Sequence, residues 1–164
     1  MSEVHPAERA QLLVAAGDLV GARRLVQAHL ALHPTDAPSL IVLAQVAKAE
    51  GQIADAERAL VAASSEPALR PVAAAMLGEM LDADAGRNDE GVRWAAEAVR
   101  LDPQDWQYRG VLAARLRDAG DLASSWTQAQ ELLRLAPTDQ LERARALTRY
   151  AAVLVAVPAW HRQA

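Results

Sequence analysis

Two of the four histidines in this 164-residue sequence, His29 and His33, stand four residues apart near the end of a predicted helix. This spacing places both imidazoles on one face of a helix, where they could bind a metal ion. Two ligands are too few for a site, and the local sequence supplies neither a carboxylate nor a third histidine to complete the shell. A histidine near a helix C-terminus is also favoured by the helix dipole. We therefore expect structural roles for both residues and no metal site.

Other residue types that carry catalysis are poorly placed for it. The pairs Ser64–Ser65 and Ser124–Ser125 lie beside turns or inside predicted helices, not in the strand-turn-helix setting that exposes a nucleophile. Lys48, the single lysine, lies in a predicted helix without the glycines of a phosphate-binding loop. The acidic residues between Asp82 and Glu90 lack the ligand spacing of a calcium loop. We expect no catalytic residues, no cofactor and no enzymatic activity.

The composition favours an all-α fold and argues against charged polymers as partners. Hydrophobic residues make up 52% of the chain, with Ala and Leu dominant and Phe absent, a mixture that suits helices better than strands. The net charge of -4 and the pI near 5.5 give no general attraction to phosphate backbones or anionic lipids. We therefore expect no nucleic-acid partner.

Neither end of the sequence resembles a targeting or membrane-spanning segment. The first ten residues, MSEVHPAERA, carry charges where a signal peptide would have its apolar run. The apolar run from Tyr150 to Trp160 is interrupted by Pro158 and is too short to span a bilayer. The absence of cysteine agrees with a reducing compartment. We expect a soluble, cytoplasmic chain that does not insert into membranes.

These side chains must be positioned by helices, and the helices follow a repeat. Glycines that precede a polar residue and an apolar stretch recur at spacings of 34, 35 and 34 residues, at Gly17, Gly51, Gly86 and Gly120. Prolines keep nearly the same spacing at Pro34, Pro67, Pro103 and Pro137. Each glycine is expected to end a first helix in a left-handed conformation. Asp18 and Asp121 then begin second helices, and each proline stops one.

Small residues recur where the two helices of each unit must approach closely. They lie five residues after the glycine, at Ala22, Ala56, Gly91 and Ser125, or seven before it, at Ala10, Ala44 and Ala113. In the third unit the pair Leu77-Gly78 lies one step earlier, which indicates a one-residue insertion in the turn of residues 82–85. Trp126, beside Ser125, is expected in the core, whereas Trp94 and Trp106 could be either buried or partly exposed on the outer side.

The four units resemble the tetratricopeptide repeat (TPR) family, whose unit is a 34-residue helix pair with small contact residues and a closing proline. The match is carried by Leu77-Gly78, Leu43-Ala44, Leu112-Ala113, Tyr150 and the endings LHPTD, LDPQD and LAPTD. It implies a single domain over residues 1–164, built as a right-handed α-solenoid of about four helix-turn-helix units. These units lie at residues 3–36, 37–70, 71–105 and 106–139, and a C-terminal capping helix lies at 140–157. Stacking of the units supplies the stability that one hairpin lacks.

The resemblance also implies that the first helices of the units line a concave groove. On this sequence its inward positions are Gln11, Ile41, Gln45, Lys48, Glu79, Asp82, Ala114 and Arg117. Chaperone-binding members of the family grip carboxylates with paired Lys/Arg and Asn residues, and the matching columns here hold Ala, Ile and Gln. We expect the groove to bind a peptide or helix segment of a partner protein. The chain is then a non-enzymatic adaptor, with the Ala-, Arg- and Leu-rich composition typical of bacterial proteins.

The last predicted helix has apolar residues on more than one side, at Tyr150, Val153, Leu154 and Val157. A terminal repeat normally ends on a polar face. This helix could therefore pair with a second copy as a homo-oligomer, cover the groove of its own array or lead into a longer chain. Two alternatives to an adaptor stay open: a self-associating structural scaffold, and the TPR regulatory part of a larger protein.

Overall fold

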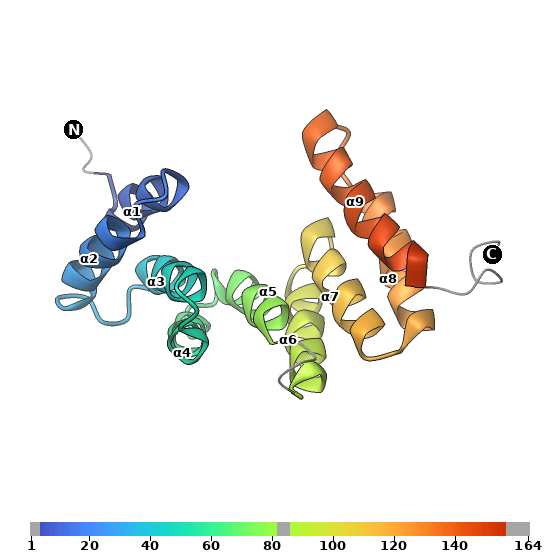
Figure 1. The fold of residues 1–164 in the computed structure, drawn as a ribbon, viewed down its shortest axis with the longest axis horizontal. Coiled ribbons are helices and arrows are strands. Elements are labelled where there is room, and N and C mark those ends of the chain that lie inside the picture. Colours follow the sequence, from blue (N-terminus) through green and yellow to red (C-terminus); the bar gives the residue numbers. More distant parts are fainter. Residues whose placement is uncertain (1–3, 82–85, 157–164) are drawn as a thin grey trace. The chain divides into compact units, whose positions relative to one another are not determined.

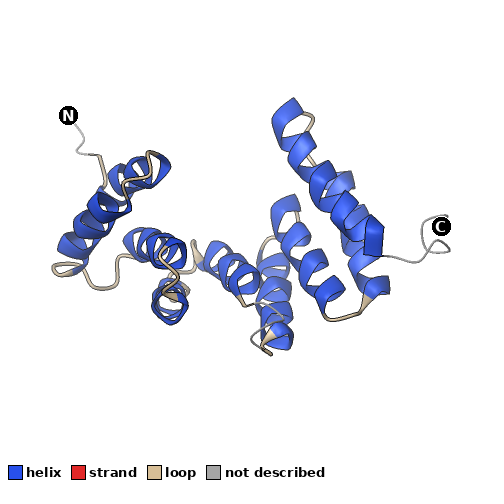
Figure 2. Ribbon diagram, in the orientation of Figure 1, coloured by secondary structure: helices blue, strands red, loops and turns tan. Residues whose placement is uncertain are grey.

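The computed structural model describes residues 4–81 and 86–156, and within these ranges every regular element is a helix (Figure 1, Figure 2). The helices are α1 (Pro6–Ala15), α2 (Leu19–Leu30), α3 (Ala37–Ala49), α4 (Ile53–Ala63), α5 (Arg70–Met80), α6 (Asn88–Leu101), α7 (Trp106–Asp118), α8 (Leu122–Leu135) and α9 (Gln140–Ala156). The predicted all-α class is confirmed. Helices α1 to α8 follow one another as four pairs, α5 begins one residue before the predicted range 71–105, and α9 follows the pairs.

The chain divides into two compact units, Met1–Ala73 (unit 1) and Ala74–Ala164 (unit 2). Unit 1 holds α1 to α4 and the first turn of α5, and unit 2 holds the remaining helices. Each unit is described by itself below. The grouping of all repeats into one domain and the right-handed sense of the array stay predictions.

The turn glycines have the backbone conformation that the repeat requires. The φ angle is 83° at Gly17, 76° at Gly51, 68° at Gly86 and 83° at Gly120. Residues with a Cβ atom rarely adopt these angles, so the glycines define where each first helix ends. Asp18 and Asp121 cap the helices that follow. The Asp18 carboxylate accepts a hydrogen bond from the Gly21 amide at 2.8 Å, and the Asp121 carboxylate accepts one from the Ser124 amide at 3.1 Å.

The aspartates at the ends of the PTD and PQD segments cap helices as well. Asp36 accepts the Ser39 amide at 3.0 Å at the start of α3, and Asp139 accepts the Leu141 amide at 3.0 Å at the start of α9. Asp105 does the same for α7. The prolines, in contrast, lie two to four residues beyond the last helical residues, which are Leu30, Ala63, Leu101 and Leu135. The prolines follow the helix ends, whereas the aspartates define the next helix starts.

The small residues predicted at the hairpin contacts are buried in both units. Ala10, Ala22, Ala44, Ala56, Ala113 and Ser125 are each at most 1% exposed. In unit 2 the Ser125 hydroxyl donates to the Ala113 carbonyl at 2.7 Å, so the two predicted contact residues meet directly between α7 and α8. In α5, a Cβ atom on Gly78 would lie 2.9 Å from the backbone nitrogen of Ala95 in α6. Such close approach allows no larger side chain.

Each unit has its own apolar core. In unit 1, small and branched side chains of α1, α2 and α3 pack together, at Ala7, Ala10, Ala22, Val26, Val42 and Val46. In unit 2, Trp126 packs with Ala113, Ala129 and Val153, and Trp106 packs with Leu132. Trp126 and Trp106 are each 7% exposed, which confirms the core position of Trp126 and resolves that of Trp106. Trp94 is partly buried and packs against the cluster that contains Ala74 and Ala98.

The contact at Ala113 generates a stability prediction. Ala113→Leu is expected to lower the free energy of unfolding by roughly 1–3 kcal/mol, because three added carbon atoms must fit where Ser125 already touches the backbone. Ala123→Leu, on an exposed position of α8, is the matched control and should change the stability by less than about 0.5 kcal/mol. Urea unfolding followed by circular dichroism measures both. Equal stability of the two variants would contradict the packing described.

Candidate functional site

An open groove of about 510 Å³ lies in unit 1 between α1, α3 and the start of α5. Three of the predicted groove residues, Gln11, Ile41 and Gln45, lie together in its wall. The other lining residues are mostly apolar: Ala7, Glu8, Leu12, Pro38, Val42, Leu69 and Val72. Lys48 is exposed near the C-terminal end of α3 and does not line this groove. The sequence therefore predicted the helices of the wall correctly, while the binding role of these residues stays a prediction.

Two side chains of this groove carry groups without a partner in the described part of the chain. Leu12 is 71% exposed, which leaves a large apolar side chain open to solvent at its edge. Gln45 Oε1 is buried and has no hydrogen-bond donor among the residues that the structure describes. A buried acceptor without a partner costs free energy, and a turn of the Gln45 side chain toward a ligand N–H group would remove that cost. The groove thus combines an apolar wall with one acceptor.

A second groove, of about 210 Å³, lies within unit 2. It brings together the predicted residues Glu79, Ala114 and Arg117. Helix α9 forms part of its wall through Arg149, Ala152 and Val153, which were not among the predicted groove residues. The remaining predicted position, Asp82, lies outside the described residues.

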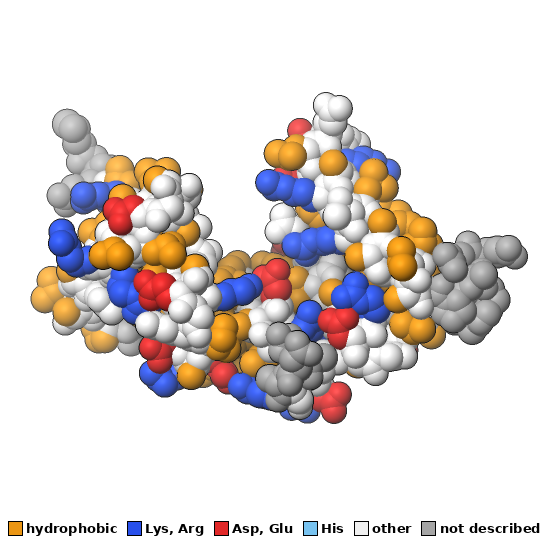
Figure 3. Space-filling model, viewed as in Figure 1, with side chains coloured by type: hydrophobic (Ala, Val, Ile, Leu, Met, Phe, Trp, Pro, Cys, Tyr) orange, Lys and Arg blue, Asp and Glu red, His pale blue; other side chains and the backbone are white. Residues whose placement is uncertain are grey.

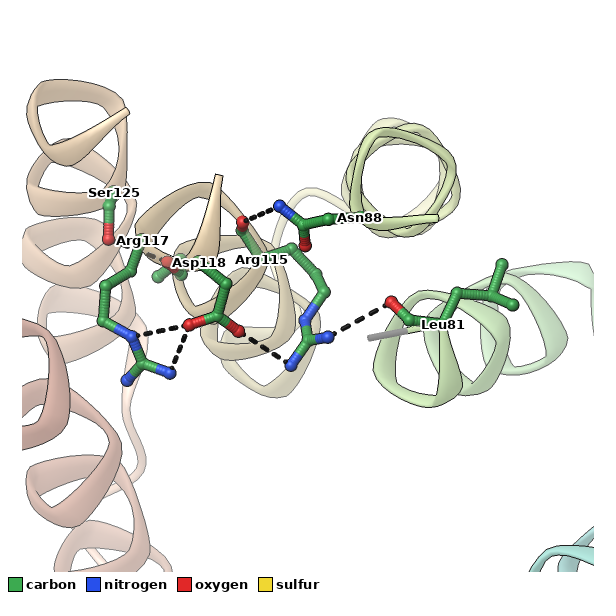
Figure 4. A network of polar contacts seen from close by, with 7 residues as sticks. Leu81, Asn88, Arg115, Arg117, Asp118 and Ser125 are labelled. Atoms are coloured by element: carbon green, nitrogen blue, oxygen red, sulfur yellow. Dashed lines mark hydrogen bonds and ion pairs between the residues drawn. The ribbon is translucent and has the colours of Figure 1, made fainter. Parts of the chain in front are cut away.

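The cations of the second groove are engaged by neighbouring groups (Figure 4). Arg117 is paired with its neighbour Asp118 at 2.7 Å. Asp118 also accepts from Arg115, at 3.0 Å. Arg115 in turn donates to the Leu81 carbonyl at 3.1 Å, beyond the end of α5. The network therefore joins the α5 end to α7, and its main role is structural.

The structure corrects the interpretation of the last helix. Val153 is 2% exposed and packs against Trp126 within the same chain, so it is not available to a second copy. Tyr150 and Leu154 pack partly against the same cluster, with the Tyr150 and Trp126 ring centroids 5.4 Å apart. Val157 lies outside the described residues. These positions looked exposed because the sequence does not show that α9 packs on α7 and α8.

The structure places a third histidine and a carboxylate beside His29, which the local sequence did not indicate. His5, immediately before α1, and Asp36, immediately before α3, lie beside it. His5 Nε2 is 3.4 Å from Asp36 Oδ1, and His29 Nε2 is 3.7 Å from Asp36 Oδ2. His5 lies 24 residues before His29 and reaches it only when the first helices pack, whereas Asp36 lies seven residues after His29, beyond the turn that follows α2. An open depression of about 540 Å³ lies over the cluster and is also lined by His33.

The carboxylate of Asp36 is held in its charged form. Burial acts to raise the pKa of Asp36, but the hydrogen bonds from Ser39 and the nearby His5 and His29 outweigh it, so the pKa lies below its ordinary value of 3.8. The same carboxylate therefore caps α3 and faces two imidazoles.

The surface carries charges of both signs. Figure 3 shows acidic and basic side chains interspersed with hydrophobic ones on the visible face of each unit. This distribution provides no single-sign patch on that face for a charged polymer. Among the described helices, none combines the length and apolar character needed to cross a bilayer.

Comparison with known proteins finds similarity in structure only. No protein-family model matches the chain, and no curated protein matches it in sequence. The crystal structure of YrrB, a TPR protein with an unusual peptide-binding site, is 16% identical with a TM-score of 0.64, covering 90% of this chain and 84% of YrrB. MamA AMB-1 is 16% identical with a TM-score of 0.68, covering 98% of this chain and 95% of MamA.

A third structure, of the APC/C hetero-tetramer Cut9–Hcn1, is 17% identical with a TM-score of 0.71. The similarity covers 92% of this chain and 31% of the matched chain in that complex. These likenesses confirm the resemblance at the level of the fold, an all-α solenoid of TPR type.

The cap at Asp36 generates a pH-dependent prediction. Asp36→Ala is expected to lower the free energy of unfolding by roughly 0.5–2 kcal/mol at neutral pH, because the Ser39 amide loses its acceptor. The pKa of Asp36 is lower in the folded protein than its ordinary value of 3.8. The charged carboxylate therefore contributes its full stabilisation at pH values above 3.8, and this stabilisation is lost as the pH falls through the lower folded-state pKa.

Urea unfolding of the wild type and the variant across this pH range measures the effect. Asp36→Asn is the control, since Asn caps helices about as well as Asp. The wild type and Asp36→Ala should converge on acidification. A difference that stays constant with pH would contradict the role of the charged carboxylate.

Proposed function

We propose that this chain, a protein with the TPR fold, is a non-enzymatic interaction module that binds a segment of a partner protein in the groove of unit 1. The observation that carries the proposal is the open groove of about 510 Å³ with its mostly apolar wall. In that wall Gln45 Oε1 has no hydrogen-bond donor among the residues that the structure describes. Ligand sites in proteins typically combine apolar walls with a few placed polar groups. A catalytic site would need a set of reactive groups, and among the described lining residues Glu8 alone carries an ionisable side chain.

The wall suits an amphipathic helix or an extended segment with apolar anchors. Leu12, Ile41 and Val72 supply apolar contacts from three different helices, which is the arrangement that a helix-in-groove complex uses. Gln11 and Gln45 can orient the segment through hydrogen bonds. Because Glu8 is the only charged lining residue, binding should depend only weakly on salt. A micromolar affinity, about -8 kcal/mol, is reasonable for a short peptide.

Two further points support the proposal. YrrB, which shares the fold, is described as having an unusual peptide-binding site, and a peptide ligand for this chain agrees with that description. The mixed surface charge favours a protein partner over a nucleic acid. We also propose a cytoplasmic, bacterial setting for the protein, on the composition alone.

A charge placed in the groove tests this function. Leu12→Lys should weaken binding at least tenfold, because the segment would have to bury an ammonium group against an apolar wall. The variant should remain folded, since Leu12 is 71% exposed and Glu8 lies four residues earlier on the same helix face. Peptides selected by the wild-type chain from a random phage-displayed library serve as probes, and isothermal titration calorimetry measures their affinity.

Val20→Lys is the matched control, because Val20 is 75% exposed in α2 and does not line the groove. It should leave the affinity unchanged. The proposal fails if the library yields no enriched peptide, or if the selected peptides bind Leu12→Lys as well as they bind the wild type.

A self-associating scaffold is a second candidate, favoured by apolar side chains of α9. Leu141, Leu147 and Val155 are 61%, 48% and 83% exposed. A second copy could bind through these exposed side chains, whereas Val153, one of the residues expected from the sequence, is buried. The remaining alternative, a regulatory part of a larger protein, stays a proposal without a specific observation in its favour.

Sedimentation velocity over a range of concentrations tests the scaffold. If α9 mediates assembly, the wild-type sedimentation coefficient should rise with concentration, and Leu147→Glu combined with Val155→Glu should abolish the rise by placing charges in the contact. Val61→Glu, at a position of α4 that is 46% exposed, is the control. A wild-type chain that sediments as a monomer at every concentration would exclude this candidate.

A further inference from the structure

We propose that His5, His29 and Asp36 form a binding site for a divalent transition-metal ion, with zinc as the ion that suits them best. Each residue offers one ligand atom, and the three atoms lie within 4.8 Å of one another. Imidazole nitrogens with one carboxylate oxygen are a ligand set that zinc accepts readily, whereas calcium and magnesium prefer oxygen ligands alone. The proposal does not depend on the function proposed for the groove.

The observed separations are close to those of a coordinated ion. Two ligand atoms that each bind a tetrahedral zinc ion at about 2.0–2.1 Å lie about 3.4 Å apart. His5 Nε2 and Asp36 Oδ1 are separated by 3.4 Å, and His29 Nε2 and Asp36 Oδ2 by 3.7 Å. These two distances run to different oxygens of Asp36, and the three ligand atoms lie within 4.8 Å of one another, so the side chains must close in around an ion.

The cluster is partly sheltered but open on one side. The side chains of His29 and Asp36 are each 18% exposed, and that of His5 is 39% exposed. The depression above them gives an ion a path from solvent and leaves room for a fourth ligand. Water can take that position, and so can His33, whose ring centroid lies 4.6 Å from that of His29. Three protein ligands with one open position are common in zinc sites.

Coordination through His5 Nε2 requires one rearrangement. His5 Nδ1 accepts the Ala7 amide at 3.2 Å, which places the proton of the neutral ring on Nε2, toward Asp36. An ion at Nε2 needs the other tautomer, with the proton on Nδ1. The Ala7 amide therefore loses its acceptor when the ion binds. This change gives the site a signature besides affinity, because the Ala7 amide signal should move in the NMR spectrum.

The three ligands come from the ends of three helices. His5 precedes α1, His29 lies in the last turn of α2, and Asp36 precedes α3. Helices α1 and α3 also form most of the wall of the unit 1 groove. A bound ion would therefore link the starts of the two wall helices and hold their spacing. We infer that zinc stabilises unit 1, because it binds the folded arrangement and not the unfolded chain.

Zinc titration of the full chain without an affinity tag tests the proposal, with a chromophoric zinc chelator as competitor. We expect one zinc ion per chain, a higher unfolding midpoint in zinc and a shift of the Ala7 amide signal. His29→Gln and Asp36→Asn should each weaken zinc binding by more than about tenfold. Loss of a residue that only hydrogen-bonds to a metal ligand typically lowers metal affinity by that much, and loss of a ligand should lower it further. Asp36→Asn keeps the α3 cap, so loss of folding would not mimic loss of the ligand.

Two matched controls complete the design. Asp18→Asn makes the same change at the cap of α2, away from the histidines, and His161→Gln removes a histidine outside the described residues. Both should bind zinc as the wild type does. Absence of saturable binding at micromolar zinc, or equal binding by the cluster variants and the controls, would overturn the proposal.

Discussion

The fold depends on how closely the two helices of each hairpin approach one another. At Ala113 and Ser125 the approach is so close that a side-chain hydroxyl reaches the backbone carbonyl of the facing helix. Gly78 against Ala95 shows the same constraint in another hairpin of unit 2. Because this contact uses one face of each first helix, the other face remains available for contacts outside the hairpin. In unit 1 that remaining face, on α1 and α3, forms the apolar groove.

Features set by local spacing could be predicted from the sequence. The turn glycines, the small contact residues and Trp126 all follow from one repeat, because each depends on its place within a hairpin of about 34 residues. The positions of Gln11, Ile41 and Gln45 in the wall followed from the resemblance to the TPR family, whose first helices turn these positions inward. The capping role of Asp36 was not among the predictions, although an aspartate before a helix with an early proline is a start signal.

Features that depend on packing between hairpins could not be predicted. His5 and Asp36 are far from one another in sequence, and no spacing rule indicates that both meet His29. Arg115 reaches the Leu81 carbonyl across a full repeat, and Val153 is buried because α9 packs back on α7 and α8. In each case the contact joins residues from different hairpins, and the sequence does not show which hairpin surfaces meet. The interactions of unit 1 also connect its two sites, because the residues that cap α1 and α3 are the proposed metal ligands.

The binding of a protein segment along the α1–α3 wall is the central claim, and the chain offers a direct measurement. It has two isoleucines, Ile41 in the wall and Ile53 at the start of α4. A sample labelled only at the isoleucine δ1 methyl groups therefore gives two NMR signals, one at the proposed site and one away from it. Titration with a selected peptide is predicted to shift the Ile41 signal and leave the Ile53 signal in place. A shift of Ile53 alone, or no shift of either signal at saturating peptide, would contradict the claim.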